Sequence, residues 1–332
     1  MMTRRSALFG TIMGALFAGA SFVGAPSYAT AAEAEKVTYL LPAPPFLPAF
    51  GPWMVAQARG YYAAEGLEVE FQAARGGVDV AKQVGAGNAV IGGAIGDTPI
   101  IVRANGIPVK AVALLGGRSL TQLVVREDSD INGPKDLKGK TVTTMSYQDT
   151  TFYALLGALA SVGLGKDDLD IQAAGPAGVW KLFAAGEAVA MSAVPDWIGI
   201  VQGQGIKVRV MPMETYFNSM AQAILASDET IEKRPELIGK LVRATLRGMK
   251  DIMDDPAGAA VDYVKAVPQH KGKEKAMESV FRLYNKYVYP GQAVPGAMDP
   301  KRLASVQDFY FEQGIVRKKS PLDDLYTNQF VE

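Results

Sequence analysis

The stretch ARGGVDVAKQVGAGNAVIGGAIGD at residues 74–97 is matched, without a gap, by AAGPAGVWKLFAAGEAVAMSAVPD at residues 173–196. Lys82 aligns with Lys181, and Asp97 aligns with Asp196. Each copy has a glycine turn, a helical segment, a glycine stop, an apolar strand and a polar loop, which is half of a βαβ unit. The repeat predicts two similar α/β lobes. The alternative is a chance likeness between two alanine-rich βα units.

The remaining chain alternates strands and helices in the same way, so we expect an α/β protein with two Rossmann-like lobes. Continuous apolar runs at 89–95 and 109–115 are typical of strands buried on both faces of a parallel sheet. From residue 228 onward the pattern turns helical, and Pro256 interrupts it. Ligands of open α/β sheets bind outside the carboxyl ends of the strands. The loops at Asp97 and Asp196 are therefore expected to face one cleft.

Two strands flank the second repeat copy, at residues 120–126 and 221–226, and they suggest how the lobes are connected. We expect residues 36–126 and 213–332 to form a first, discontinuous lobe, and residues 127–212 to form a second lobe inserted into it.

The amino-terminal segment has the pattern of an export signal. Arg4 and Arg5 precede an uncharged run from Ser6 to about Ala25, and small residues at 29–31 provide a cleavage site. We expect a signal peptide over residues 1–31 and a periplasmic mature protein. The arginine pair also resembles a twin-arginine signal. The run is long enough to span a membrane, so an uncleaved anchor is the alternative.

Composition narrows the possible functions. The 332 residues are 48% hydrophobic and 20% charged, as expected for a globular protein. The 34 basic and 34 acidic residues balance, so no excess of positive charge indicates nucleic-acid binding. The chain has no cysteine, which excludes disulfides, thiolate metal sites and cysteine nucleophiles. Its single histidine, His270, lies in a polar, lysine-rich run and is expected in a solvated loop rather than in a metal or catalytic site.

Catalytic and cofactor signatures are missing from the sequence. We find no nucleophile elbow, no phosphate-loop lysine motif and no His/Asp/Glu cluster at metal spacing. The glycines of residues 92–96 do not have the spacing of a dinucleotide fingerprint. We therefore expect a binding protein without a metal or cofactor, not an enzyme.

Six segments of the chain have a familiar pattern: residues 58–70 (ARGYYAAEGLEVE), 96–99 (GDTP), 106–109 (GIPV), 133–142 (GPKDLKGKTV), 234–237 (RPEL) and 255–257 (DPA). Through them the chain, from Lys36 to about Pro256, resembles the periplasmic solute-binding proteins of ABC importers, in the branch that takes nitrate, sulfonates, taurine and thiamine-precursor pyrimidines.

The resemblance implies the type II periplasmic binding protein fold, in which two crossover strands join two lobes and a ligand is trapped in the cleft between them. It also implies a small-molecule ligand and the permease of an ABC importer as partners; we expect a monomer that binds no nucleic acid. Two other functions stay open. One is the binding module of a sensory system, and the other is an enzyme like the thiamine-pyrimidine synthases of this fold. That enzyme uses a cysteine-rich segment and a histidine, so the cysteine-free chain disfavours it.

Candidate ligand contacts lie in the loops after the predicted strands. Aromatic rings are suited to hold a planar or alkyl body, while an arginine and helix N-termini are suited to an acidic group. The carboxylates of Asp97 and Asp196 would accept from an amine or a ring N–H, and they disfavour a purely inorganic anion. The alternatives are that Asp97 caps its helix, Trp197 belongs to the lobe core and Arg118 pairs with a surface carboxylate. The expected contacts are Phe46, Gly77, Asp97, Thr98, Arg118, Ser119, Ser146, Tyr147, Gln148, Asp196 and Trp197.

Overall fold

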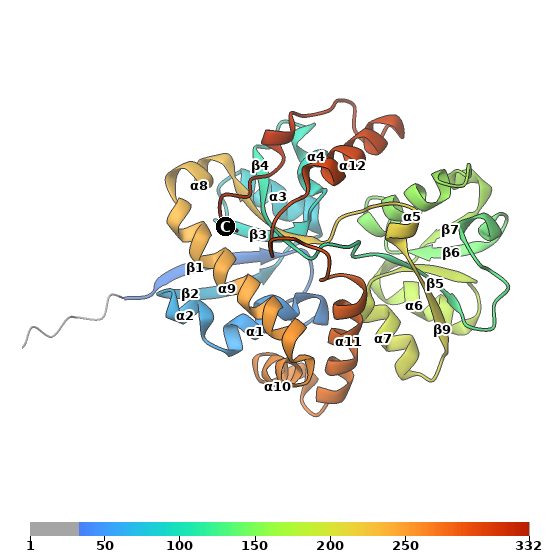
Figure 1. The fold of residues 1–332 in the computed structure, drawn as a ribbon, viewed down its shortest axis with the longest axis horizontal. Coiled ribbons are helices and arrows are strands. Elements are labelled where there is room, and N and C mark those ends of the chain that lie inside the picture. The colour runs from blue at the N-terminus through green and yellow to red at the C-terminus, as the bar shows by residue number, and fades with distance from the viewer. Residues whose placement is uncertain (1–32, 332) are drawn as a thin grey trace, which may run out of the picture. The chain divides into compact units, whose positions relative to one another are not determined.

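The computed structural model describes residues 33–331, and within this range ten strands form two separate five-stranded sheets (Figure 1). The predicted signal peptide, residues 1–31, lies outside the described residues. The α/β class and the two-lobed arrangement expected from the repeat are confirmed.

The first sheet has the strand order β2-β1-β3-β10-β4. β2 and β3 run parallel to β1, whereas β10 runs antiparallel to both of its neighbours. Its strands are β1 (Glu35–Leu41), β2 (Leu67–Ala73), β3 (Ile91–Ile95), β4 (Val109–Leu115) and β10 (Gln222–Ser227).

The second sheet repeats this topology with the order β7-β6-β8-β5-β9, in which β5 is the antiparallel strand. Strands β3 and β8 come from the two repeat copies and occupy the same place in their sheets. Gly87 and Gly186 end the preceding helices with φ angles of 75° and 79°, a backbone conformation that favours glycine. The strands are β5 (Gln122–Arg126), β6 (Thr141–Thr144), β7 (Asp170–Ala173), β8 (Ala190–Ala193) and β9 (Val208–Pro212).

Strand β5 lies in the second sheet, although we expected it to close the first lobe. It pairs with β8 and β9, and Val124 and Val125 are fully buried in the two hydrophobic clusters of that sheet. Consecutive residues of a strand point to opposite faces of the sheet, so Val124 and Val125 are both buried only if both faces are covered. In the second lobe one hydrophobic cluster covers each face. The chain crosses between the sheets at residues 116–121 and returns at 213–221.

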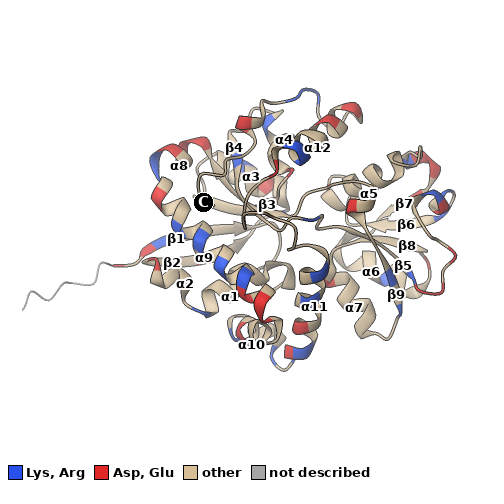
Figure 2. Ribbon diagram, viewed as in Figure 1, with Lys and Arg blue, Asp and Glu red and all other residues tan. Residues whose placement is uncertain are grey.

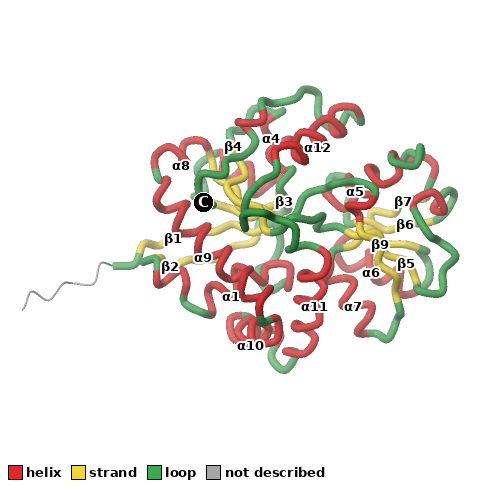
Figure 3. Tube along the Cα trace, viewed as in Figure 1, coloured by secondary structure: helices red, strands yellow, loops and turns green. Residues whose placement is uncertain are grey.

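Helices surround both sheets, as the red and yellow segments of Figure 3 show. The carboxyl-terminal helices return to the first lobe, where α9 packs against α1. The helices are α1 (Gly51–Ala58), α2 (Tyr61–Ala64), α3 (Gly77–Gly85), α4 (Thr98–Arg103), α5 (Thr150–Ala160), α6 (Gly175–Ala185), α7 (Pro195–Gly203), α8 (Asp228–Lys233), α9 (Pro235–Asp254), α10 (Pro256–Ala266), α11 (Glu274–Tyr287) and α12 (Pro300–Glu312).

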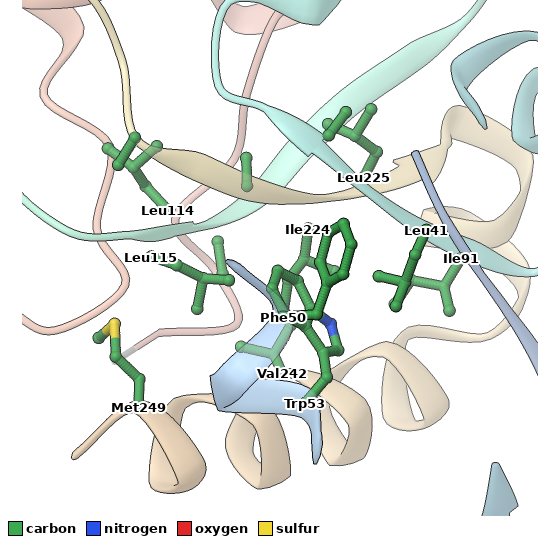
Figure 4. Close-up of a cluster of buried hydrophobic side chains, with 14 of the residues drawn as sticks. Leu41, Phe50, Trp53, Ile91, Leu114, Leu115, Ile224, Leu225, Val242 and Met249 are labelled. Atoms are coloured by element: carbon green, nitrogen blue, oxygen red, sulfur yellow. The ribbon is translucent and has the colours of Figure 1, made fainter. Parts of the chain in front are cut away.

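The core of the first lobe lies between its sheet and helices α1 and α9 (Figure 4). Trp53 of α1 is fully buried, and its ring meets Phe50 edge-on at a centroid distance of 5.9 Å. Leu41, Ile91 and Ile224 cover the same cluster from the strands. The charges of the described residues are interspersed in sign rather than gathered in one field (Figure 2), as the balanced composition predicts.

Candidate functional site

Most residues that we predicted as ligand contacts lie where a strand ends and the next helix begins. Gly77 and Thr98 are neighbours in the first lobe, since a Cβ on Gly77 would lie 3.3 Å from the hydroxyl of Thr98. Arg118 and Ser119 lie instead in the first crossover segment. The remaining positions are Phe46 after β1, Asp97 after β3, Ser146, Tyr147 and Gln148 between β6 and α5, and Asp196 and Trp197 in the first turn of α7.

Asp97 stands at the start of α4, but its side chain does not cap that helix. The hydroxyl of Tyr310, from α12, donates to Asp97 Oδ2 at 2.5 Å, and the carboxyl group is fully buried. Burial raises the pKa of Asp97 to about 6, against the lowering effect of the Tyr310 hydrogen bond. Asp149 of the second lobe also raises it. The carboxyl group therefore lies where the two lobes meet.

Asp196, the repeat partner of Asp97, has a closely similar environment. The hydroxyl of Tyr284, from α11, donates to Asp196 Oδ1 at 2.8 Å, and the backbone N–H of Ala49 donates to Oδ2 at 3.0 Å. Burial raises the pKa of Asp196 to about 6, against the lowering effect of the Tyr284 hydrogen bond. Because Ala49 follows β1 and Asp196 follows β8, this carboxylate ties the first lobe to the second.

The two crossover segments hold each other through the residues that we expected to contact ligand. The hydroxyl of Ser119 donates to the carbonyl of Ser219 at 3.0 Å, which joins the outgoing segment to the returning one. Arg118 donates to the carbonyl of Lys286 at 2.9 Å and lies 3.6 Å from the carboxylate of Glu214. The alternative pairing of Arg118 with a carboxylate is therefore present in this structure.

Arg302 of α12 holds the same two segments from the other side. Its guanidinium donates to the carbonyls of Gly117, Asn218 and Ser219, so it contacts both crossovers at once. Desolvation lowers the pKa of Arg302 to about 10, while the charges of Glu214, Asp299 and Asp97 raise it. The arginine is 9% exposed, and three carbonyl dipoles take the place of a direct ion pair.

The three aromatic residues of the predicted site differ in exposure. Trp197 is only 9% exposed and packs with Val124 and Met191 in a core cluster of the second lobe. Phe46 is 39% exposed and Tyr147 is 49% exposed. These two rings are available to a ligand as the structure stands, whereas Trp197 is mostly covered.

His270 supports the loop that carries Phe46. Its Nε2 lies 2.8 Å from the carbonyl oxygen of Phe46, and the hydroxyl of Tyr263 donates to that same oxygen at 2.6 Å. A carbonyl only accepts hydrogen bonds, so Nε2 carries a proton here. His270 lies in the short 3₁₀ turn Pro268–His270 and is partly exposed, and its ring also fixes the backbone of the loop that carries Phe46.

The sequence did not indicate the residues that complete this arrangement: Asp149, Tyr153, Tyr284, Arg302 and Tyr310. The tyrosines and Arg302 belong to amphipathic helical patterns, in which a core position and a polar contact look alike. Tyr153 packs on Tyr310 with a ring-centroid distance of 5.4 Å, so α5 of the second lobe contacts α12. Only the fold brings these residues to the strand ends.

A groove away from the strand ends is the other candidate for a site. A groove of about 850 Å³ lies at the amino end of β1, between β2 and α1, with Lys36, Glu68 and Lys265 on its walls. It is open to solvent and far along the strands from the paired aspartates, so we place the candidate site at the strand ends. Among residues 33–331 no group of three or more histidine or carboxylate side chains is placed to hold a metal ion.

Comparisons with known proteins agree with this architecture. The riboflavin-binding protein RibY of Chloroflexus aurantiacus is 28% identical over 298 residues, which cover 85% of this chain and 82% of the relative. The 4-amino-5-hydroxymethyl-2-methylpyrimidine phosphate synthase of Schizosaccharomyces pombe is 26% identical over 278 residues, which cover 79% of this chain and 78% of the enzyme.

A solved structure shows the same fold. The periplasmic aliphatic sulphonate binding protein SsuA of Escherichia coli superposes with a TM-score of 0.70 at 18% identity, covering 91% of this chain and 94% of SsuA. The two-lobed periplasmic binding protein fold expected from the resemblance is thereby confirmed. A family model described as NMT1/THI5 like matches residues 47–259. Together with the two sheets and their shared topology, this match establishes that the chain belongs to the NMT1/THI5-like family.

Proposed function

We propose that this protein is an extracytoplasmic substrate-binding protein, which captures a small organic solute between its lobes and delivers it to an ABC importer. The observation that carries the proposal is the pair of repeat-related aspartates, Asp97 and Asp196, at the strand ends of two sheets. One of them already hydrogen bonds across the lobes to Ala49. Ligands of such sheets bind at strand ends, so a solute held there would contact both lobes and favour their closure.

The candidate solutes are sulfonates, aromatic or other organic acids, and pyrimidine-like compounds. Flavins are added because one relative is named for riboflavin, and pyrimidines are supported by the relative named for a pyrimidine phosphate. Exposed Phe46 and Tyr147 would stack on a ring or alkyl body, and the backbone N–H groups at Gly77 and Thr98 would donate to its polar atoms. Ser146, Gln148, Asp97 and Asp196 supply further polar contacts. Arg118, Ser119 and Trp197 would act mainly by shaping the crossover and the second lobe.

A ligand screen followed by small-angle X-ray scattering tests solute capture. Purified mature protein is heated with sulfonates, aromatic carboxylates, pyrimidines and flavins, and each compound that raises the melting temperature is titrated by calorimetry. We expect at least one compound to bind and to reduce the radius of gyration as the lobes close. A screen in which no compound changes either quantity would contradict solute capture.

Delivery to an importer is tested separately, in cells. We expect cells that lack this protein to lose uptake of the identified solute, and a plasmid copy to restore it. Normal uptake without the protein, together with a transcriptional response that requires it, would favour the sensory alternative.

None of the helices in residues 33–331 combines the length and the apolar character of a membrane span. Export to the periplasm and a monomeric state are parts of the same proposal.

An enzymatic role like that of the pyrimidine phosphate synthases is the second candidate, since one of these enzymes is 26% identical to the chain. We favour binding for a chemical reason. The chain contains no cysteine, and its one histidine is occupied by the carbonyl of Phe46. Incubation of the protein with a bound pyrimidine or flavin, followed by mass spectrometry of the compound, should return it unchanged.

A further inference from the structure

The two repeat-related aspartates differ in one respect. In Asp196 both carboxylate oxygens accept a hydrogen bond, one from Tyr284 and one from Ala49. In Asp97 only Oδ2 has a donor, Tyr310, while the fully buried Oδ1 has no partner among the described residues. A buried carboxylate oxygen without a donor costs free energy, and in the other copy the corresponding oxygen, Asp196 Oδ2, accepts from the backbone N–H of Ala49. The free oxygen of Asp97 therefore points to a donor that comes from outside the chain.

The groups around Asp97 show which chemistry would fit. Asp149 and Tyr153, both on the second lobe, lie close enough to interact electrostatically with its carboxylate. Arg302, whose positive charge acts on Asp97, already donates to three backbone carbonyls. A second carboxylate nearby would repel an anionic head group such as a sulfonate, and the N–H groups that Arg302 gives to the backbone are not available to pair with such an anion. They favour a neutral or positively charged group that donates.

We propose that Asp97 Oδ1 accepts a hydrogen bond from an N–H or O–H group of the captured solute, so that the solute class is a neutral or cationic donor-bearing compound rather than a sulfonate, nitrate or carboxylate. This inference rests on the proposed solute-binding function and makes its ligand class specific. Because Tyr153 of the second lobe packs on Tyr310, the donor to Asp97, the carboxyl group lies at the boundary between the lobes, where a captured solute would meet it. Asp97 thus selects solutes that carry a hydrogen-bond donor, while the exposed rings of Phe46 and Tyr147 stack on planar groups of many kinds.

Matched probes test the proposal. Calorimetry compares lumiflavin and 4-amino-2-methylpyrimidine, which carry N–H donors, with ethanesulfonate and benzoate, which only accept. The methylated compound 3-methyllumiflavin keeps the ring system of lumiflavin but lacks its N–H. We expect at least one donor-bearing probe to bind, neither acid to bind at about 1 mM, and methylation to weaken lumiflavin about tenfold or more if lumiflavin binds.

The protein side is tested with Asp97→Asn. In this variant the Tyr310 hydroxyl would donate to the amide oxygen, so the amide NH₂ group would stand in the place of Oδ1. An NH₂ group cannot accept a hydrogen bond from the N–H or O–H group of the solute. We expect affinity for the donor-bearing probe to fall about tenfold or more. Asp255→Asn removes a charge at the start of α10 but retains a capping side chain, and it should bind as the unaltered protein does.

Several results would overturn the proposal. These are unchanged affinity of a folded Asp97→Asn protein, tight binding of ethanesulfonate or benzoate, and failure of both donor-bearing probes. If Asp97→Asn does not fold, the comparison of the five probes on the unaltered protein still decides the ligand class. Binding of an acid alone removes the donor class and leaves solute capture standing. Only failure of the broad ligand screen as well would remove the proposed function.

Discussion

Two buried carboxyl groups, Asp97 and Asp196, should determine how the stability of this protein responds to pH. Burial raises the pKa of each to about 6, from the ordinary aspartate value of 3.8. A raised pKa means that the folded state binds the proton more tightly than the unfolded state. The contribution to the free energy of unfolding is therefore complete below about pH 4 and is lost as the pH rises through 6. Each group accounts for about 3 kcal/mol of this loss.

We expect Asp97→Asn to flatten the pH dependence of stability. The amide cannot ionise, so the loss of about 3 kcal/mol between pH 4 and pH 7 should be missing from the variant. Urea unfolding at several pH values measures it, with Asp255→Asn as the control for an exposed aspartate. A variant that loses as much stability as the unaltered protein over this range would show that Asp97 does not titrate as described.

Arg302 should contribute more to stability than its position in an amphipathic helix suggests. Arg302→Ala removes a donor from three carbonyls of the crossovers, of which Ser219 keeps the hydroxyl of Ser119, and we expect a loss of about 2 to 4 kcal/mol in the free energy of unfolding. Arg302→Lys should restore only part of it, because an ammonium group lacks the planar fork.

The matched control for Arg302 is Arg317→Ala, which removes an exposed arginine from the tail and should change stability by less than about 0.5 kcal/mol. Chemical denaturation of the three variants decides the matter. Equal effects of the two alanine substitutions would mean that Arg302 does not hold the crossovers together.

At the scale of elements, the packing of α9 against α1 brings the two backbones closest at Gly248. A Cβ on Gly248 would lie 2.1 Å from the carbonyl oxygen of Pro52 and 2.9 Å from the backbone nitrogen of Ala56. Backbone atoms cannot move aside as a side chain can. In the same helix, a Cβ on Gly239 would meet only the end of the Arg243 side chain at 3.1 Å.

These two glycines give a paired prediction. Gly248→Ala should destabilise the protein by about 2 to 4 kcal/mol, because the cost of overpacking exceeds the gain of about 1 kcal/mol in helix propensity. Gly239→Ala should be neutral or stabilising by up to about 1 kcal/mol. Melting temperatures of both variants measure the difference. A Gly248→Ala protein as stable as Gly239→Ala would place α9 farther from α1 than the structure does.

The elements were more predictable than their contacts. The repeat placed β3 and β8 correctly, because apolar strands and glycine stops are local patterns in the sequence. The tyrosines that bind Asp97 and Asp196 lie 213 and 88 residues away from them along the chain, and no local pattern encodes such a distance. Strand β5 was assigned to the wrong lobe for a related reason, since an apolar strand does not reveal which of two sheets it joins.

At the scale of the whole molecule, export remains the prediction that most affects the mature chain. We expect signal peptidase to cut after about Ala31 and to remove the only two charges of the leader, Arg4 and Arg5. Intact-mass measurement of protein from the periplasmic fraction tests this. A mass that begins at Met1 would contradict cleavage and favour the uncleaved anchor.

The pairing of β5 with β9 has a consequence for how this molecule can be rebuilt. The register sets Gln122, at the start of the second sheet, directly opposite Pro212, at its end. A segment whose entry and exit lie side by side can be removed or replaced with little entropic cost of loop closure. We therefore expect residues 122–212 to behave as an exchangeable cassette. A chimera that carries the corresponding segment of a relative should fold, and it would combine the first lobe of one protein with the second lobe of another.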